Sequence, residues 1–246
     1  MTRLAQCILA PNPGPMTLDG TNSYIIATPD AAATVIVDPG PLDESHLAKL
    51  TARPVELILI THHHADHTEA SAELHRRTGA PVRAADPAHC ISGDPLTDGE
   101  LIEAGGASIR VVATPGHTAD SVCFELAEDR SMLTGDTILG RGTTVIIPPD
   151  GTLGDYLETL GRLGEFGALT VLPGHGPELP DLAAIASQYL EHRLARLDQV
   201  REVIAGLGRS VTVEDVAKAV YPDVRGDVKK AAQQSIRAQL DYLATE

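Results

Sequence analysis

The sequence of 246 residues contains no tryptophan, and only five tyrosines and two phenylalanines. Because aromatic residues make up 3% of the chain, its core must be built mainly from Ala, Val, Ile and Leu. Hydrophobic residues still account for 43% and charged residues for 22%. This balance is typical of folded globular proteins and excludes a disordered chain.

Cysteine and long apolar segments are also scarce. The three cysteines, Cys7, Cys90 and Cys123, are odd in number and show no pairing pattern, so we expect free thiols in a reducing compartment. The apolar stretch near the N-terminus is too short for a signal peptide. Nothing approaches the ~20 apolar residues that span a membrane. These features predict a cytoplasmic protein with no membrane partner.

Positive charge is in short supply. The chain has 19 Lys and Arg against 34 Asp and Glu, a net charge of −15, which disfavours non-specific binding to nucleic acid or anionic membranes. Residues 1–179 hold 10 basic against 24 acidic side chains, whereas residues 180–246 hold 9 against 10. The imbalance is therefore −14 in the first part and −1 in the second, which indicates two domains.

Short apolar segments bounded by Gly, Pro or Asp predict strands. We expect strands at 23–28, 33–38, 55–61, 108–114, 121–127, 131–136 and 168–175. Helical periodicity at 43–52, 68–79 and 153–166 predicts helices between them, and hence a layered α/β architecture.

From about Leu182 the pattern is helical throughout, with one long helix and two shorter ones. We therefore expect an α/β domain at 1–180 and a separate, small all-helical domain at 181–246.

The segment THHHADH, at residues 61–67, carries four potential metal ligands: His62, His64, Asp66 and His67. In an extended segment, residues i and i+2 point to the same side, so His62 and His64 can converge on one ion. Asp66 and His67 can serve a second. Neutral imidazole and carboxylate suit zinc first, and manganese or iron as second choices. The alternative is a solvated His-rich loop.

Four ligands cannot complete two coordination spheres, so more are expected downstream. His117 in ATPGHT, Asp136 in LTGDT and His175 in LPGHG each stand where a predicted strand ends in a turn, beside a glycine. Each one alone is more often an ordinary loop residue. In this order after the His cluster, they predict a two-metal centre.

These motifs, together with the opening NPGPMTLDGTNSYII and the strand-end VDPG, resemble the metallo-β-lactamase superfamily over residues 12–180. The resemblance implies a four-layer αβ/βα sandwich with a small helical domain appended, and two Zn²⁺ ions at one edge of the sheets. One ion would take His62, His64 and His117. The other would take Asp66, His67 and His175, with Asp136 bridging both. Asp38 would orient a metal-bound histidine, although it could equally cap the next helix.

Details within the motifs separate branches of the superfamily. A carboxylate at Asp136 is similar to the glyoxalase II and ribonuclease branches, whereas true β-lactamases usually lack it. We therefore expect β-lactam hydrolysis to be at most promiscuous. The opening segment and the helical tail resemble the beta-lactamase-like protein 2 branch more closely. That resemblance implies a winged-helix-like C-terminal domain, here without the β-wing of a complete one.

The expected chemistry is hydrolysis by a hydroxide held between two dications, because two metals lower the pKa of a shared water to near 7. Asp66 would orient the hydroxide and pass a proton to the leaving group. The domain at 1–180 is the expected catalytic domain, and the helical domain at 181–246 is not needed for this chemistry. The acidic character of the catalytic domain favours a small or carrier-bound ester or thioester as the substrate.

Two alternatives remain. An endoribonuclease is implied by the resemblance to the beta-lactamase-like protein 2 branch. Its physical support is a helix face with Lys229, Gln233 and Arg237, and with Lys230 and Gln234 beside them, which could contact RNA phosphates. A solvated helix face explains the same pattern. A nucleic-acid-binding module with a vestigial metal site would predict lost ligands, yet all of them are present.

Overall fold

Two five-stranded mixed sheets form the centre of the fold. The computed structural model describes residues 4–208, 211–222 and 227–246. The first sheet has the order β1-β2-β3-β4-β5, with β3, β4 and β5 parallel to one another. Its strands are β1 Ala5–Leu9, β2 Asn22–Ile26, β3 Thr34–Val37, β4 Val55–Leu59 and β5 Val82–Arg83.

The second sheet has the order β10-β9-β8-β7-β6, and only β9 and β10 pair in parallel. Its strands are β6 Leu101–Ala104, β7 Ala107–Ala113, β8 Val122–Leu126, β9 Ser131–Gly135 and β10 Thr170–Pro173.

Strand β3 shows why the first sheet is buried on both faces. Val35 and Val37 belong to the core between the two sheets, together with Phe124 of β8, whereas Ile36 belongs to a separate core on the other face. Because successive side chains point to opposite faces, an unbroken apolar strand needs a cover on each side. Leu47 and Leu74 supply the cover on the Ile36 side.

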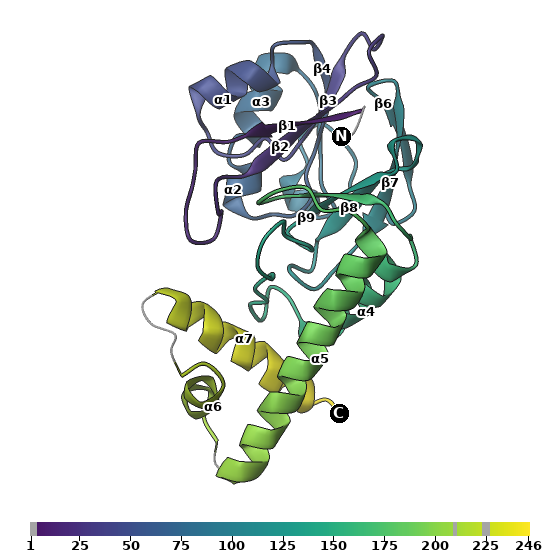
Figure 1. Cartoon of the computed structure of the whole chain (residues 1–246). Coiled ribbons are helices and arrows are strands. Elements are labelled where there is room, and N and C mark those ends of the chain that lie inside the picture. The colour runs from purple at the N-terminus through teal and green to yellow at the C-terminus, as the bar shows by residue number, and fades with distance from the viewer. Residues whose placement is uncertain (1–3, 209–210, 223–226) are drawn as a thin grey trace. The chain divides into compact units, whose positions relative to one another are not determined.

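Those two leucines lie on α1 Glu44–Leu50 and α3 Ser71–Thr78, which sit on one face of the first sheet (Figure 1). The very short α2, Ala65–Thr68, precedes α3. Both longer helices fall within segments that the sequence predicts to be helical.

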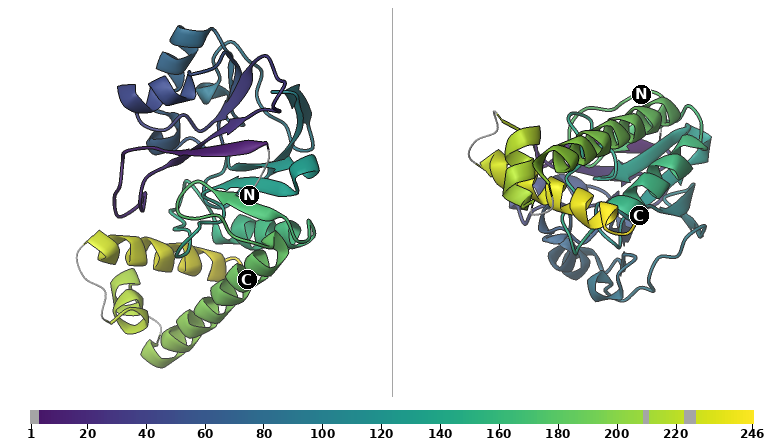
Figure 2. Two further views of the ribbon diagram at one scale, coloured as in Figure 1. Left: turned by 45° about the horizontal axis from the view of Figure 1, so that its top comes forward. Right: turned by 90° about the horizontal axis from the view of Figure 1, so that it is seen from below.

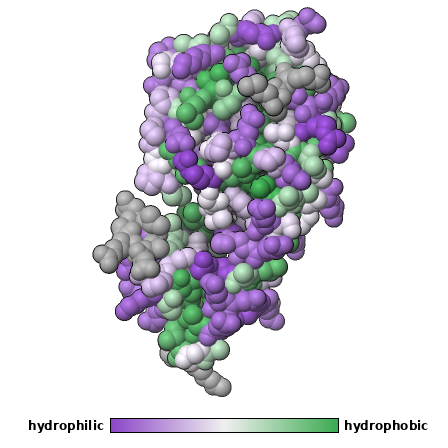
Figure 3. Space-filling view, in the orientation of Figure 1, coloured by the Kyte–Doolittle hydropathy of each residue, from purple (hydrophilic) through white to green (hydrophobic). Residues whose placement is uncertain are grey.

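The C-terminal part of the chain is helical. Its elements are α5 Leu182–Leu207, α6 Val213–Val220 and α7 Asp227–Leu243, whereas α4 Leu153–Gly164 precedes β10 in the chain. Helix α5 runs for 26 residues without interruption (Figure 2) and is followed by Gly208 with φ of 88°. Thr212 and Asp215 form a capping box at the start of α6. Val200, Val216 and Ile236 build a small core of their own, and apolar side chains also reach the surface here (Figure 3).

The chain divides into two compact units. The first comprises Met1–Thr114, Asp120–Gly142 and Ala168–Leu182, and the second comprises Pro115–Ala119, Thr143–Gly167 and Ala183–Glu246. The predicted α/β class, with two packed sheets, helices and a helical C-terminal region, is confirmed. A domain boundary at residue 180 stays a prediction.

Among the described helices, none combines the length and apolar character needed to cross a membrane. The cellular compartment stays a prediction.

Candidate metal centre

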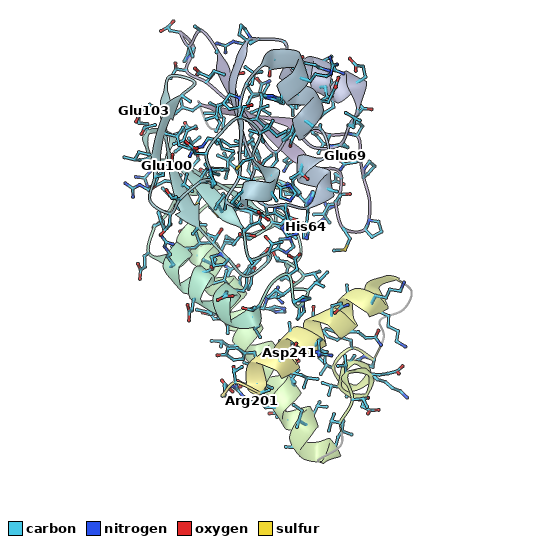
Figure 4. The ribbon with its side chains drawn as sticks, turned by 180° about the vertical axis from the view of Figure 1, so that it is seen from behind. His64, Glu69, Glu100, Glu103, Arg201 and Asp241 are labelled. Atoms are coloured by element: carbon cyan, nitrogen blue, oxygen red, sulfur yellow. The ribbon has the colours of Figure 1, made fainter. Side chains whose placement is uncertain are left out.

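The segment after β4 delivers four of the predicted ligands to one place. His62 and His67 are buried, with 1% and 0% of their surface exposed, whereas His64 and Asp66 are partly exposed. His64 and Glu69 flank the short helix α2 at its two ends (Figure 4). The turn into this helix brings Asp66 and His67 back alongside His62, whose ring centroid lies 4.3 Å from that of His67.

Asp38 lies at the end of β3 and is buried. One carboxylate oxygen accepts a hydrogen bond from the Thr61 amide at 2.8 Å. The other accepts from the Thr61 hydroxyl at 2.7 Å and from His67 Nδ1 at 2.8 Å. The cap of α1 is Asp43, whose carboxylate accepts from the His46 amide. Of the two roles considered for Asp38, the structure therefore shows contact with a histidine of the cluster.

These hydrogen bonds determine which ring nitrogen of each buried histidine carries a proton in the neutral state. His67 Nδ1 must donate, because its partner is a carboxylate. The Thr61 hydroxyl gives its hydrogen to Asp38, so it accepts from His62 Nδ1 at 3.0 Å. His175 Nδ1 faces the Gly20 carbonyl at 3.1 Å and must also donate. All three rings are thus left with a lone pair on Nε2, the form that binds metals.

The Nε2 atoms of His67 and His175 lie 3.3 Å apart. Asp66 Oδ2 is 3.1 Å from His175 Nε2 and 3.3 Å from His67 Nε2. Asp136 adds oxygens at 3.4 Å and 3.6 Å from the same two nitrogens. Facing lone pairs repel one another unless a positive charge lies between them. The donor set therefore fits a bound cation.

Two groups of three ligands lie wholly within the first unit, each with donor atoms within 4.8 Å of one another. One group is Asp66, His67 and His175, and the other is His62, His67 and Asp136.

The pKa shifts show that this cluster attracts positive charge. Burial disfavours protonation of His175, but hydrogen bonds to Asp136 and Asp66 outweigh it and raise its pKa to about 9. Burial acts on His67 in the same way, and the charges of Asp38 and Asp136 overcome it to raise its pKa. Burial would raise the pKa of Asp66, but hydrogen bonds to His175 and His67 lower it strongly.

The N-terminal loop holds His175 in position, a function that sequence reasoning missed. His175 bonds to the Gly20 carbonyl, as described above, and Thr21 also pairs with His175 in an isolated β-bridge. The Asn22 side chain donates to the carbonyls of Pro173 and Gly176, at 2.9 Å and 2.8 Å, on either side of His175. The signal in the sequence is the DGTN segment of the opening motif.

Gly174 lies in the turn just before His175, where the backbone passes close to Asp136 and His67. A Cβ there would lie 2.5 Å from Asp136 Oδ1 and 2.9 Å from His67 Cε1. No side chain fits this space, so the glycine of LPGHG lets the backbone pass beside the predicted ligands.

His117 belongs to the second unit, where its Nδ1 donates to the Val145 carbonyl at 2.8 Å. This bond also leaves its Nε2 with a lone pair in the neutral ring. The assignment of His117 to the first ion stays a prediction from the sequence. His63, between two predicted ligands, bonds through Nδ1 to Asp120 at 2.8 Å.

A protein family and several relatives match most of this chain. Residues 16–175 match the metallo-β-lactamase superfamily. The chain belongs to this superfamily. A beta-lactamase-like protein 2 homolog from Caenorhabditis elegans is 32% identical, with 97% of this chain and 83% of that protein covered. The predicted resemblance to the superfamily and to that branch is therefore confirmed.

Two further relatives extend the comparison. An atrochrysone carboxyl ACP thioesterase from Aspergillus chevalieri is 33% identical, covering 92% of this chain and 75% of its own. The crystal structure of a metallo-β-lactamase family protein from Thermus thermophilus has a TM-score of 0.81 at 24% identity, covering 98% of this chain and 93% of its own. The chain is thus a superfamily hydrolase whose His and Asp groups could hold metal.

Proposed function

We propose that this superfamily member is a dinuclear metallohydrolase. Zinc is the first choice for both ions because the donors are imidazoles and carboxylates, and manganese or iron are alternatives. The observation that carries the proposal is the approach of His67 and His175 through Nε2, with both Nδ1 atoms already bonded. The proposed ligands are His62, His64 and His117 for one ion, Asp66, His67 and His175 for the other, and Asp136 for both.

When bound, the ions would supply Lewis acidity and lower the pKa of a water molecule. The residues of the chain do the remaining work. Asp38 keeps the Nε2 lone pairs of His62 and His67 available. Asp66 is the proposed proton carrier, because its side chain is 29% exposed and its Oδ2 already lies among the imidazoles. Its lowered pKa keeps it ionised, the form that can hold a metal ion and accept a hydrogen bond from bound water.

We propose a small or carrier-bound acyl ester or thioester as the substrate. The relative from Aspergillus chevalieri is by name a thioesterase for an acyl carrier protein. Residues 1–179, with a balance of −14, would repel a polyanion such as RNA. Two Zn²⁺ ions would reduce that balance only to −10. Beta-lactam turnover is proposed as at most promiscuous.

The second candidate is an endoribonuclease, favoured by a groove along α6 and α7. Its lining includes Lys230, Gln233, Gln234 and Arg237. Part of this positive charge is already compensated, because Arg237 pairs with Asp241 at 2.9 Å and Lys229 pairs with Glu214 at 3.3 Å. Exposed pairs are weak, so phosphate could still compete for these side chains. The compensation nevertheless favours the acyl substrate.

A hydrolysis panel tests the proposal. Metal-loaded protein is incubated with an acyl thioester, single-stranded RNA and a cephalosporin reporter, and with His62→Ala as the inactive control. We expect the thioester to be consumed, the RNA to survive and the cephalosporin to react slowly at most. Efficient RNA cleavage that is lost in His62→Ala would overturn the substrate assignment. Unchanged hydrolysis in His62→Ala would overturn the metal mechanism.

A further inference from the structure

Arg193 is a cationic side chain of α5 that is almost completely buried, with 8% of its surface exposed. Its Nη2 donates to the carbonyl oxygen of Thr144. Its guanidinium carbon lies 5.2 Å from the ring centroid of Tyr156, a cation–π distance. Its Nε is buried with no hydrogen-bond partner within the described part of the chain. A buried cation is costly, so these few contacts must define its orientation.

The first contact leads directly to a predicted metal ligand. Arg193 holds the carbonyl of Thr144, and the next carbonyl along the chain, that of Val145, accepts from His117 Nδ1 at 2.8 Å. A fixed Thr144 limits how far the following peptide can rotate, because the backbone has only two soft dihedrals per residue. Arg193 thereby holds the acceptor that keeps the proton of His117 on Nδ1 and the lone pair on Nε2.

The second contact reaches the residues just before His117. The backbone of Tyr156 packs so closely on Gly116 that a Cβ on Gly116 would overlap the Tyr156 Cα. Gly116 also has φ of 136°, in the region that favours glycine. One turn further along α4, the Thr159 hydroxyl donates to the Pro115 carbonyl at 2.7 Å. The ring beneath Arg193 therefore belongs to the residue that fixes the backbone of the His117 turn.

We propose that Arg193 is a positioning residue for metal binding, which orients His117 through the successive carbonyls of Thr144 and Val145 and through Tyr156. The proposal rests on the proposed metal function, and it lies entirely within the second unit. It gives the C-terminal helical region a part in the chemistry, against the expectation from sequence that residues 181–246 are not needed.

The test is zinc titration of the metal-free full-length chain by calorimetry. Arg193→Met keeps the length of the side chain and removes its charge and donors. We expect affinity for one ion to fall by roughly 10- to 100-fold, the usual effect of losing a partner that orients a ligand, and affinity for the other to stay unchanged. Arg193→Lys keeps a donor and should recover part of the loss. With Co²⁺ as the probe, the visible spectrum of one site should change.

Arg196→Met is the matched control. Arg196 lies on the same helix, 4.7 Å from the ring centroid of Tyr221, so its removal deletes a similar contact. The control should bind both ions like wild type.

Wild-type affinities in Arg193→Met, or an equal loss in Arg196→Met, would overturn the proposal. If circular dichroism shows Arg193→Met to be unfolded, wild-type affinities in Arg193→Lys and in Tyr156→Leu would overturn it. If wild type binds two ions, a failure of the Arg193 prediction leaves the proposed metal function standing. If wild type binds no metal, the role of Arg193 and the proposed function are both overturned.

Discussion

His67 Nε2 and His175 Nε2 face each other at 3.3 Å across 108 residues of sequence. The opposite nitrogen of each ring is occupied, by Asp38 for His67 and by the Gly20 carbonyl for His175. Neither ring can turn away without breaking a buried hydrogen bond, which costs about 1–3 kcal/mol. The two buried hydrogen bonds therefore hold both Nε2 atoms in place, as the proposed metal site requires.

Metal content is the first prediction. The purified chain should carry up to two zinc-like ions by elemental analysis, because the proposed ligands provide two sites. A strong chelator should abolish hydrolysis, and added Zn²⁺ should restore it. A chain without transition metal whose hydrolysis resists the chelator would contradict the dinuclear assignment.

Asp136→Ala should be the most damaging single substitution among the proposed ligands, because a bridging carboxylate serves both ions. The loss in kcat/KM should exceed the roughly 10- to 100-fold typical of residues that only support a ligand. Metal stoichiometry measured on the same sample should fall as well. A mutant with wild-type turnover and metal content would show that Asp136 is not a bridge.

Asp38→Asn should weaken metal binding by about 10- to 100-fold. Asparagine keeps the size of the side chain but has one acceptor oxygen instead of two and no negative charge. It must give up either the bond from the Thr61 amide or those from the Thr61 hydroxyl and His67 Nδ1, and in both orientations it supports the His67 ring less strongly. Zinc titration measures the change. Asp43→Asn is the control, because Asp43 caps α1 and asparagine caps helices equally well. Equal affinities in the two variants would remove Asp38 from the site.

Gly20→Ala should lower both the free energy of unfolding and the affinity for one ion. Gly20 has φ of 137°, and a Cβ there would overlap the Ala10 carbonyl, so the loop that supports His175 must shift. Gly79→Ala is the matched control, since Gly79 has φ of 75° with open space around it. The control should lose only about 1–2 kcal/mol of stability from its left-handed backbone and should bind metal normally. Urea unfolding and zinc titration of both variants provide the comparison, and normal zinc binding by Gly20→Ala would contradict the role of this loop.

The last prediction separates the two substrate classes. If RNA is a substrate, replacing Lys229, Lys230 and Arg237 with Gln should weaken its cleavage and flatten the salt dependence, because fewer counterions are released. Thioester turnover by this triple variant should hardly change, whether or not RNA is also a substrate. We expect wild type to consume thioesters and to leave RNA intact at all salt concentrations. Salt-sensitive RNA cleavage that the triple variant loses would establish the ribonuclease instead.

The sequence by itself determined most of the strands, most of the helices and the order of the motifs, but it did not predict β1, β5 and β6. The strongly apolar segment at 55–61 predicts a strand covered on both faces, and β4 has side chains in both cores. The sequence predicts helix α5 because its helical periodicity is long and uninterrupted and ends at a glycine. His62, His67, Asp136 and His175 were identified from local spacing at strand ends, and the structure brings them together. Such features are recoverable because each depends on neighbours within a few residues.

Only the tertiary structure decided what holds the candidate ligands. Asp38 could be a helix cap or a histidine partner until the parallel pairing of β3 with β4 placed it beside Thr61 and His67. Gly20 reaches His175 across 155 residues, and Arg193 reaches Thr144 across 49. The acceptors at Gly20 and Thr144 are backbone carbonyls, which every residue carries. A sequence pattern cannot single out one carbonyl from another, so these contacts become visible only when the chain has folded.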